Sequence, residues 1–170
     1  MPDDPFALLG LPRRFVVDAA QLQAAWLRRT AALHPDRIAD PMQQAEAARN
    51  SARLNDARKM LHDHEQRANA LLSLLGGPAK EQDKSLPDGF LMDILDVRQR
   101  MEEAQASGDD AELRKFETWA NQQRSEYISQ LTSLFEAAAA SPDPDLLRQI
   151  RQLLNAWRYI ERMREQVRPS

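Results

Sequence analysis

Three consecutive residues able to take part in chemistry, His34, Pro35 and Asp36, stand between two long segments whose apolar residues recur at helical spacing. A histidine beside a carboxylate can act as a general base or supply metal ligands. A histidine base, however, needs a nucleophile or a substrate group within reach, and the chain has no cysteine and no matching serine motif. The other histidines, His62 and His64, are two residues apart and would point to different sides of a continuous helix. A metal-dependent hydrolase using His34, Asp36, His62 and His64 is therefore the least supported interpretation.

Taken by itself, the same tripeptide predicts a turn. Pro35 fixes its own φ and pushes His34 out of the α region, so the preceding helix should end there, and aspartate is common in turns. Three arginines near the turn in the sequence add positive charge: Arg28, Arg29 and Arg37. Cations at a helix C-terminus also stabilise its dipole, so an ordinary helix end and a surface that another protein recognises both stay open.

The composition limits the class of protein. With 42% hydrophobic and 29% charged residues among 170, the chain should fold as one domain or two small ones. The absence of cysteine excludes disulfides, thiolate catalysis and direct cysteine ligation of an iron-sulfur cluster. A net charge of −3 offers no basic field for nucleic acid, and no apolar run approaches the roughly 20 residues needed to cross a bilayer. The N-terminal residues resemble neither a secretory signal nor a transit peptide, so we expect a cytoplasmic protein without a cofactor or a bound metal.

The elements that must position these residues are all helical, because β-branched alternating patterns are missing and Ala, Leu, Gln, Arg and Glu fill long windows. Asp18 followed by Gln21 is a capping-box pattern, and Gly10 and Gly108 stand where helices should end. The expected helices are 5–9, 18–33, 41–62, 65–75, 88–106, 110–139 and 145–167. On the third, a small-residue face is expected to pack on its predecessor: Ala45, Ala48, Ala52, Leu54 and Leu61. Residues 77–87 read as a linker, and 88–170 as a three-helix bundle.

One expected helix has more apolar residues than a core face needs. At about 100° per residue, a core stripe is formed by Phe90, Ile94, Val97, Met101 and Ala104. Leu91, Met92 and Leu95 lie well outside that stripe, and on the last helix Tyr159 lies nearly opposite Ile150, one of the residues expected in its core. Exposed apolar residues inside a charged rim are typical of a partner site, although bundle helices can also bury a broad arc.

Several motifs of the first half agree with one another: a Phe-x-x-Leu-Gly opening, a helix with Trp26, the His-Pro-Asp turn, and a helix ending NSARLNDARKML. Together they resemble a J domain, here residues 1–76. The resemblance implies an antiparallel helix pair that presents its turn to a DnaK-type chaperone and stimulates that partner's ATPase. It assigns chaperone contacts to His34, Pro35, Asp36, Arg28, Arg29 and Arg37. Such a protein performs no bond chemistry itself and is not an enzyme.

The second half narrows the resemblance. The stretches QRANALLSLLG and GFLMDILDVRQRMEEA, in a J domain followed by an acidic bundle, are similar to the HscB family of iron-sulfur cluster co-chaperones. The family implies two partners, an HscA-like chaperone and an IscU-like scaffold protein. Its scaffold contacts fall here on Leu91, Met92, Leu95, Asp96, Gln99, Glu103 and Tyr159. Gln99 stands where an acidic residue is expected, and His64 replaces the family's proline. A J-domain adaptor for another client protein is the alternative.

Overall fold

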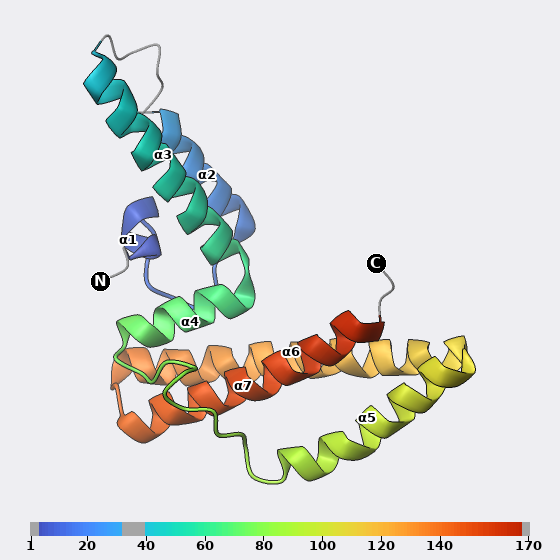
Figure 1. Ribbon diagram of the computed structural model, residues 1–170. Coiled ribbons are helices and arrows are strands. Elements are labelled where there is room, and N and C mark those ends of the chain that lie inside the picture. Colours follow the sequence, from blue (N-terminus) through green and yellow to red (C-terminus); the bar gives the residue numbers. More distant parts are fainter. Residues whose placement is uncertain (1–3, 32–39, 168–170) are drawn as a thin grey trace. The chain divides into compact units, whose positions relative to one another are not determined.

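The computed structural model describes residues 4–31 and 40–167, which contain seven helices and no strand (Figure 1). The predicted all-α fold, a J domain followed by a three-helix bundle, is confirmed. The chain divides into two compact units, Met1–Leu74 and Leu75–Ser170.

Four helices form the N-terminal unit: α1 (Pro5–Leu9), α2 (Ala19–Ala31), α3 (Pro41–His62) and α4 (His64–Leu74). Their starts follow from capping. The Asp18 carboxylate accepts a hydrogen bond from the Gln21 backbone N–H at 2.8 Å, as the capping-box pattern predicts. Asp63, between α3 and α4, accepts one from the N–H of Gln66, also at 2.8 Å. This cap ends the continuous helix between His62 and His64.

The helices α2 and α3 run side by side as a hairpin (Figure 1). Their buried residues are Leu22 and Ala25 on α2 and Ala47, Leu54, Ala57 and Leu61 on α3. Trp26 joins the two helices at their margin, because its indole N–H donates to the Asn55 amide oxygen at 2.8 Å and the Arg58 guanidinium lies 4.6 Å from its ring centre. The hairpin is therefore held by apolar burial and by the contacts of Trp26 with Asn55 and Arg58.

The predicted small-residue face of α3 is wrong in part. Leu54 and Leu61 are buried as expected, but Ala45, Ala48 and Ala52 are exposed. These alanines lie about 100° to 160° around the helix from the buried Ala47. Alanine tolerates both environments, so an alanine spacing alone does not identify the buried face.

A buried arginine that the sequence did not single out ties the N-terminal unit together. Arg67 on α4 is 5% exposed and donates hydrogen bonds to the Phe15 carbonyl, at 2.7 Å, and to the Leu61 carbonyl. Its guanidinium also lies 5.4 Å from the Phe15 ring centre. Burial lowers the pKa of Arg67, and the nearby Asp63 opposes that shift. One side chain thus joins the loop before α2, the end of α3 and α4.

Three long helices form the C-terminal unit: α5 (Phe90–Ser107), α6 (Asp110–Ala140) and α7 (Pro144–Val167). The most fully buried large side chains of this unit are Leu131 on α6 and Ile150, Leu154 and Ile160 on α7. These two helices pack more extensively on each other than either does on α5. α5 begins at Phe90 and not at Asp88, because Gly89 has a left-handed φ of 79° and serves as the N-cap. On α7 the sequence pattern predicts an apolar side of Leu146, Ile150, Leu153, Trp157 and Ile160; the last four are buried and Leu146 is half-buried.

The segment predicted as a linker is attached to α7. The Arg151 Nε donates to the Pro78 carbonyl at 3.0 Å, and the Asn155 amide donates to the carbonyls of Asp83 and Ser85 at 3.1 and 2.9 Å. Arg151 is only 4% exposed. Residues 78–85 therefore form a strap on the bundle, although their composition is that of a free linker.

Candidate docking surfaces

The tripeptide His34-Pro35-Asp36 lies outside the described residues, as does Arg37. The described ends on either side are Ala31, the last residue of α2, and Asp40, which caps α3. The Asp40 carboxylate accepts from the Met42 N–H at 3.0 Å. His34, Pro35 and Asp36 therefore fall in the sequence between the end of α2 and the cap of α3.

The two arginines in the last turn of α2 have different surroundings. Both are exposed, but they lie about 100° apart around the helix. The Arg29 guanidinium packs against the end of α1, where a Cβ placed on Gly10 would be 2.8 Å from it. Gly10 has a φ of 67°, so glycine suits this position both for its backbone and for the space that Arg29 occupies. Arg28 is the better placed of the two for contact with another protein.

The apolar surplus predicted on α5 is exposed. Leu91, Met92 and Leu95 have 53%, 76% and 58% of their surface accessible, while Ile94, Met101 and Ala104 of the same helix are buried. We call the exposed side of α5 the docking face; it consists of Leu91, Met92, Leu95, Asp96, Gln99 and Glu103. Three large apolar side chains in solvent on a well-formed helix are the mark of a surface that a partner covers.

Polar side chains of the docking face are linked along α5. The Gln99 amide donates to Glu103 at 2.8 Å, and Asp96 pairs with Arg100 at 2.9 Å. Each link joins positions four apart on an exposed helix surface, where such pairs contribute little to stability and exchange readily. The carboxylates of Asp96 and Glu103 are therefore accessible to cations of a partner.

Tyr159 reaches the docking face from α7. Its ring is half-buried and meets Phe90 edge-on, with the ring centres 5.7 Å apart and an interplanar angle of 86°. Its hydroxyl accepts a hydrogen bond from Arg98 at 3.4 Å. The structure thus brings Tyr159 beside α5 through Phe90 and through Arg98, which borders the exposed leucines in the sequence pattern. Phe90 had been placed in the core stripe, and no spacing within one helix reveals a contact between α5 and α7.

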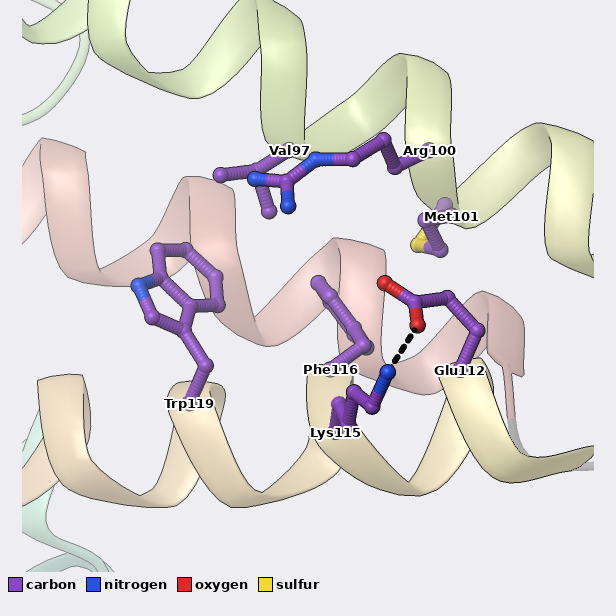
Figure 2. Close-up of a pocket in the computed structure, with 7 residues that line it drawn as sticks. All are labelled: Val97, Arg100, Met101, Glu112, Lys115, Phe116 and Trp119. Atoms are coloured by element: carbon purple, nitrogen blue, oxygen red, sulfur yellow. Dashed lines mark hydrogen bonds and ion pairs between the residues drawn. The ribbon is translucent and has the colours of Figure 1, made fainter.

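A groove lies between α5 and α6 (Figure 2). It has a volume of about 190 Å³, and its lining residues are Val97, Arg100, Met101, Glu112, Lys115, Phe116 and Trp119. Met101 and Phe116 are buried, and the Phe116 and Trp119 rings lie 5.7 Å apart. An ion pair of 2.8 Å between Lys115 and Glu112 crosses one side of the groove (Figure 2). None of the lining residues belongs to the docking face. Arg100 is connected to that face through its ion pair with Asp96.

The histidines within the described ranges are not gathered into a site. His62 is exposed, and His64 is half-buried with its ring 6.4 Å from that of Phe15. Over residues 4–31 and 40–167 no three His, Asp or Glu side chains are placed to hold a metal ion. None of the helices in these ranges has the length and apolarity needed to cross a membrane.

Comparison with known proteins agrees with this geometry. Residues 86–168 match the family model described as the HSCB C-terminal oligomerisation domain. A co-chaperone protein HscB homolog of Haemophilus influenzae is 34% identical over an alignment of 174 positions, which covers 96% of this chain and 97% of the relative.

Two solved structures extend the likeness to the whole fold. The chaperone HscB from Vibrio cholerae aligns over 98% of this chain and 100% of its own, with 28% identity and a TM-score of 0.66. The crystal structure of human co-chaperone protein HscB aligns over 97% of this chain and 80% of its own, with 24% identity and a TM-score of 0.80. The fold is a helical hairpin unit followed by a three-helix bundle, and the relatives are co-chaperones. Together they define the class of protein as a J-domain co-chaperone. The chain belongs to the HscB co-chaperone family.

Proposed function

We propose that this co-chaperone joins an iron-sulfur scaffold protein of the IscU type to an HscA-like DnaK-type chaperone and stimulates that chaperone's ATPase. Residues 1–76 serve as the J domain, 77–87 as the connection and 88–170 as the scaffold-binding bundle. The loop with His34, Pro35 and Asp36 engages the chaperone, helped by three nearby arginines: Arg28, Arg29 and Arg37. The docking face and Tyr159 engage the scaffold.

One observation above all supports the scaffold-binding half of this proposal. Leu91, Met92 and Leu95 are more than half exposed on α5, although the same helix buries Ile94 and Met101. Burying three such side chains against a partner would contribute roughly 1.5 kcal/mol or more each before the costs of association. Met92 adds an adaptable, polarisable contact.

The mechanism is that of an adaptor. The bundle captures the scaffold and the J domain docks on the chaperone, so the scaffold's effective concentration at the chaperone rises as ATP hydrolysis is triggered. Hydrolysis then tightens the chaperone's grip on the scaffold and favours release of the cluster to acceptors. The positive charge of Arg28 speeds approach to an acidic chaperone surface at modest ionic strength. The protein itself supplies contacts and no reacting group.

The test separates the two surfaces. His34→Gln should abolish stimulation of the chaperone's steady-state ATPase and leave scaffold affinity unchanged. Leu91→Ala with Leu95→Ala should weaken scaffold binding by about a hundredfold, because roughly 1.5 kcal/mol is lost per leucine, and should leave basal ATPase stimulation intact. If one folded variant lost both activities, the division of labour proposed here would be wrong.

The same ATPase assay distinguishes an IscU-like scaffold from another client protein. With the wild-type chain, the IscU-like scaffold should increase ATPase stimulation beyond what either protein gives alone. Stimulation by the chain that the scaffold does not change would retain the chaperone contact and refute the scaffold assignment. Arg148→Ala serves as a surface control, because Arg148 is exposed on α7 and pairs with Asp145, three residues earlier on the same helix.

A further inference from the structure

Tyr159 is the only scaffold contact assigned to α7, and α5 holds it at both ends of its side chain. The Phe90 ring packs edge-on against the tyrosine ring at 5.7 Å. At the other end, the Arg98 guanidinium donates to the tyrosine hydroxyl at 3.4 Å. The side chain of Tyr159 therefore depends on α5 for its place, although it belongs to another helix.

Arg98 also has a partner on its own helix. Its Nε donates to the Glu102 carboxylate at 2.8 Å, one helical turn along α5. The hydrogen bonds from Arg98 to Glu102, and then to Tyr159, raise the pKa of Arg98. Glu102, Arg98 and Tyr159 thus form a chain of contacts from α5 to α7, and the guanidinium stays charged throughout the physiological range.

The location of this chain matters because it borders the docking face. On the helical wheel Arg98 lies about 20° from Leu91 and about 60° from Leu95, so all three share one side of α5. A tyrosine held against that side extends the apolar surface from α5 to α7. A side chain already fixed in its bound position loses less conformational freedom when the partner arrives.

We infer that Arg98 and Phe90 are positioning residues for scaffold binding, which act by holding Tyr159 against the docking face. This inference rests on the proposed function, since that function supplies the partner. Arg98 acts through the tyrosine hydroxyl and Phe90 through the tyrosine ring. Neither residue needs to touch the scaffold for its loss to weaken binding.

The first experiment asks whether Arg98 positions Tyr159 in the free protein. The chain has two tyrosines, so labelling with 3-fluorotyrosine gives two ¹⁹F resonances, and Tyr159→Phe identifies which is which. Arg98→Met keeps an unbranched side chain without the guanidinium; it should shift the Tyr159 resonance and leave that of Tyr127 unchanged. Phe90→Leu should shift the same resonance. Arg148→Met, a matched change on exposed α7, should shift neither.

The second experiment asks whether binding depends on that position. By titration calorimetry of the full-length chain with the IscU-like scaffold, Arg98→Met should weaken affinity roughly fivefold, the loss expected for one exposed hydrogen bond. In the Tyr159→Phe background, where no hydroxyl remains to be held, the same change should alter affinity less than twofold. This non-additivity is the sign of a residue that acts through another.

Two results would overturn the inference. An unshifted Tyr159 resonance in Arg98→Met would show that the guanidinium does not hold the tyrosine. Equal weakening of binding in both backgrounds would show that Arg98 contacts the scaffold directly. If the wild-type chain failed to bind the scaffold, the proposed function would be lost, whereas the fluorine experiment would still decide whether Arg98 positions Tyr159.

Discussion

Tyr127 shows how a single buried side chain makes the stability of the bundle depend on pH. It lies on α6 with 8% of its surface exposed, and burial, with a smaller effect of Glu126, raises its pKa to about 12. A tyrosine in the unfolded chain titrates near 10, so the folded state keeps its proton to higher pH than the unfolded state does. The stability from this group is complete below about pH 10 and is lost as the pH rises toward 12.

The variant Tyr127→Phe isolates this contribution, because it keeps the ring and removes the ionisable hydroxyl. Between pH 9 and 12 the free energy of unfolding of the wild-type chain should fall by about 1 to 2 kcal/mol more than that of the variant. Urea unfolding at a series of pH values, followed by circular dichroism, measures the difference. Identical pH profiles for the two proteins would contradict the assigned shift, whatever the lysines contribute to both.

Single residues also show what a sequence can reveal about a site. The exposure of Leu91 and Leu95 was predictable, because a helix has one core direction and these residues point elsewhere. The contacts of Phe90 and Arg98 with Tyr159 were not, since they depend on how two distant helices pack. The roles of His34, Pro35 and Asp36 remain predictions from the sequence, because they lie outside the described residues.

Among the elements, the helices were the most predictable part of the molecule. Caps at Asp18 and Gly10 and the turn at Gly108 mark local backbone conformations that a few residues determine, so most helix limits agree within two residues. The strap of residues 78–85 was not predictable as such. Its composition is that of a flexible linker, and the side chains that bind it belong to α7, some seventy residues away.

Asn155 attaches the strap to α7 by two hydrogen bonds. Asn155→Ala should leave the carbonyls of Asp83 and Ser85 without this donor, at a cost of about 1 kcal/mol or more. Amide hydrogen exchange in residues 79–85 should then become roughly fivefold to tenfold faster, with exchange in the N-terminal unit unchanged. Gln149→Ala, an exposed position on the same helix, is the control. Unaltered exchange in the strap would mean that other contacts are sufficient to hold it.

The whole chain divides into two compact units, as an adaptor with two separate binding surfaces requires. Each unit has a core of its own: Phe6, Leu9, Leu61 and Leu72 are fully buried in the first, and Leu131, Ile150, Leu154 and Ile160 in the second. The buried Arg67 bonds within the first unit, and the strap bonds within the second. Separate cores predict that either unit can fold without the other.

A chain cut after Gly76 should therefore give two folded pieces. Together they should lack the extra ATPase stimulation that the scaffold gives with the intact chain. Residues 77–170 should still bind the scaffold, and residues 1–76 should still stimulate the chaperone's ATPase, both checked separately with circular dichroism for folding. Mixed in equal amounts, they should lose the extra stimulation that the scaffold gives with the intact chain, because the second contact is no longer intramolecular; recovering it should need at least a tenfold higher concentration. Full stimulation by the mixture at the same concentration would show that the scaffold acts on the chaperone without being tethered to the J domain.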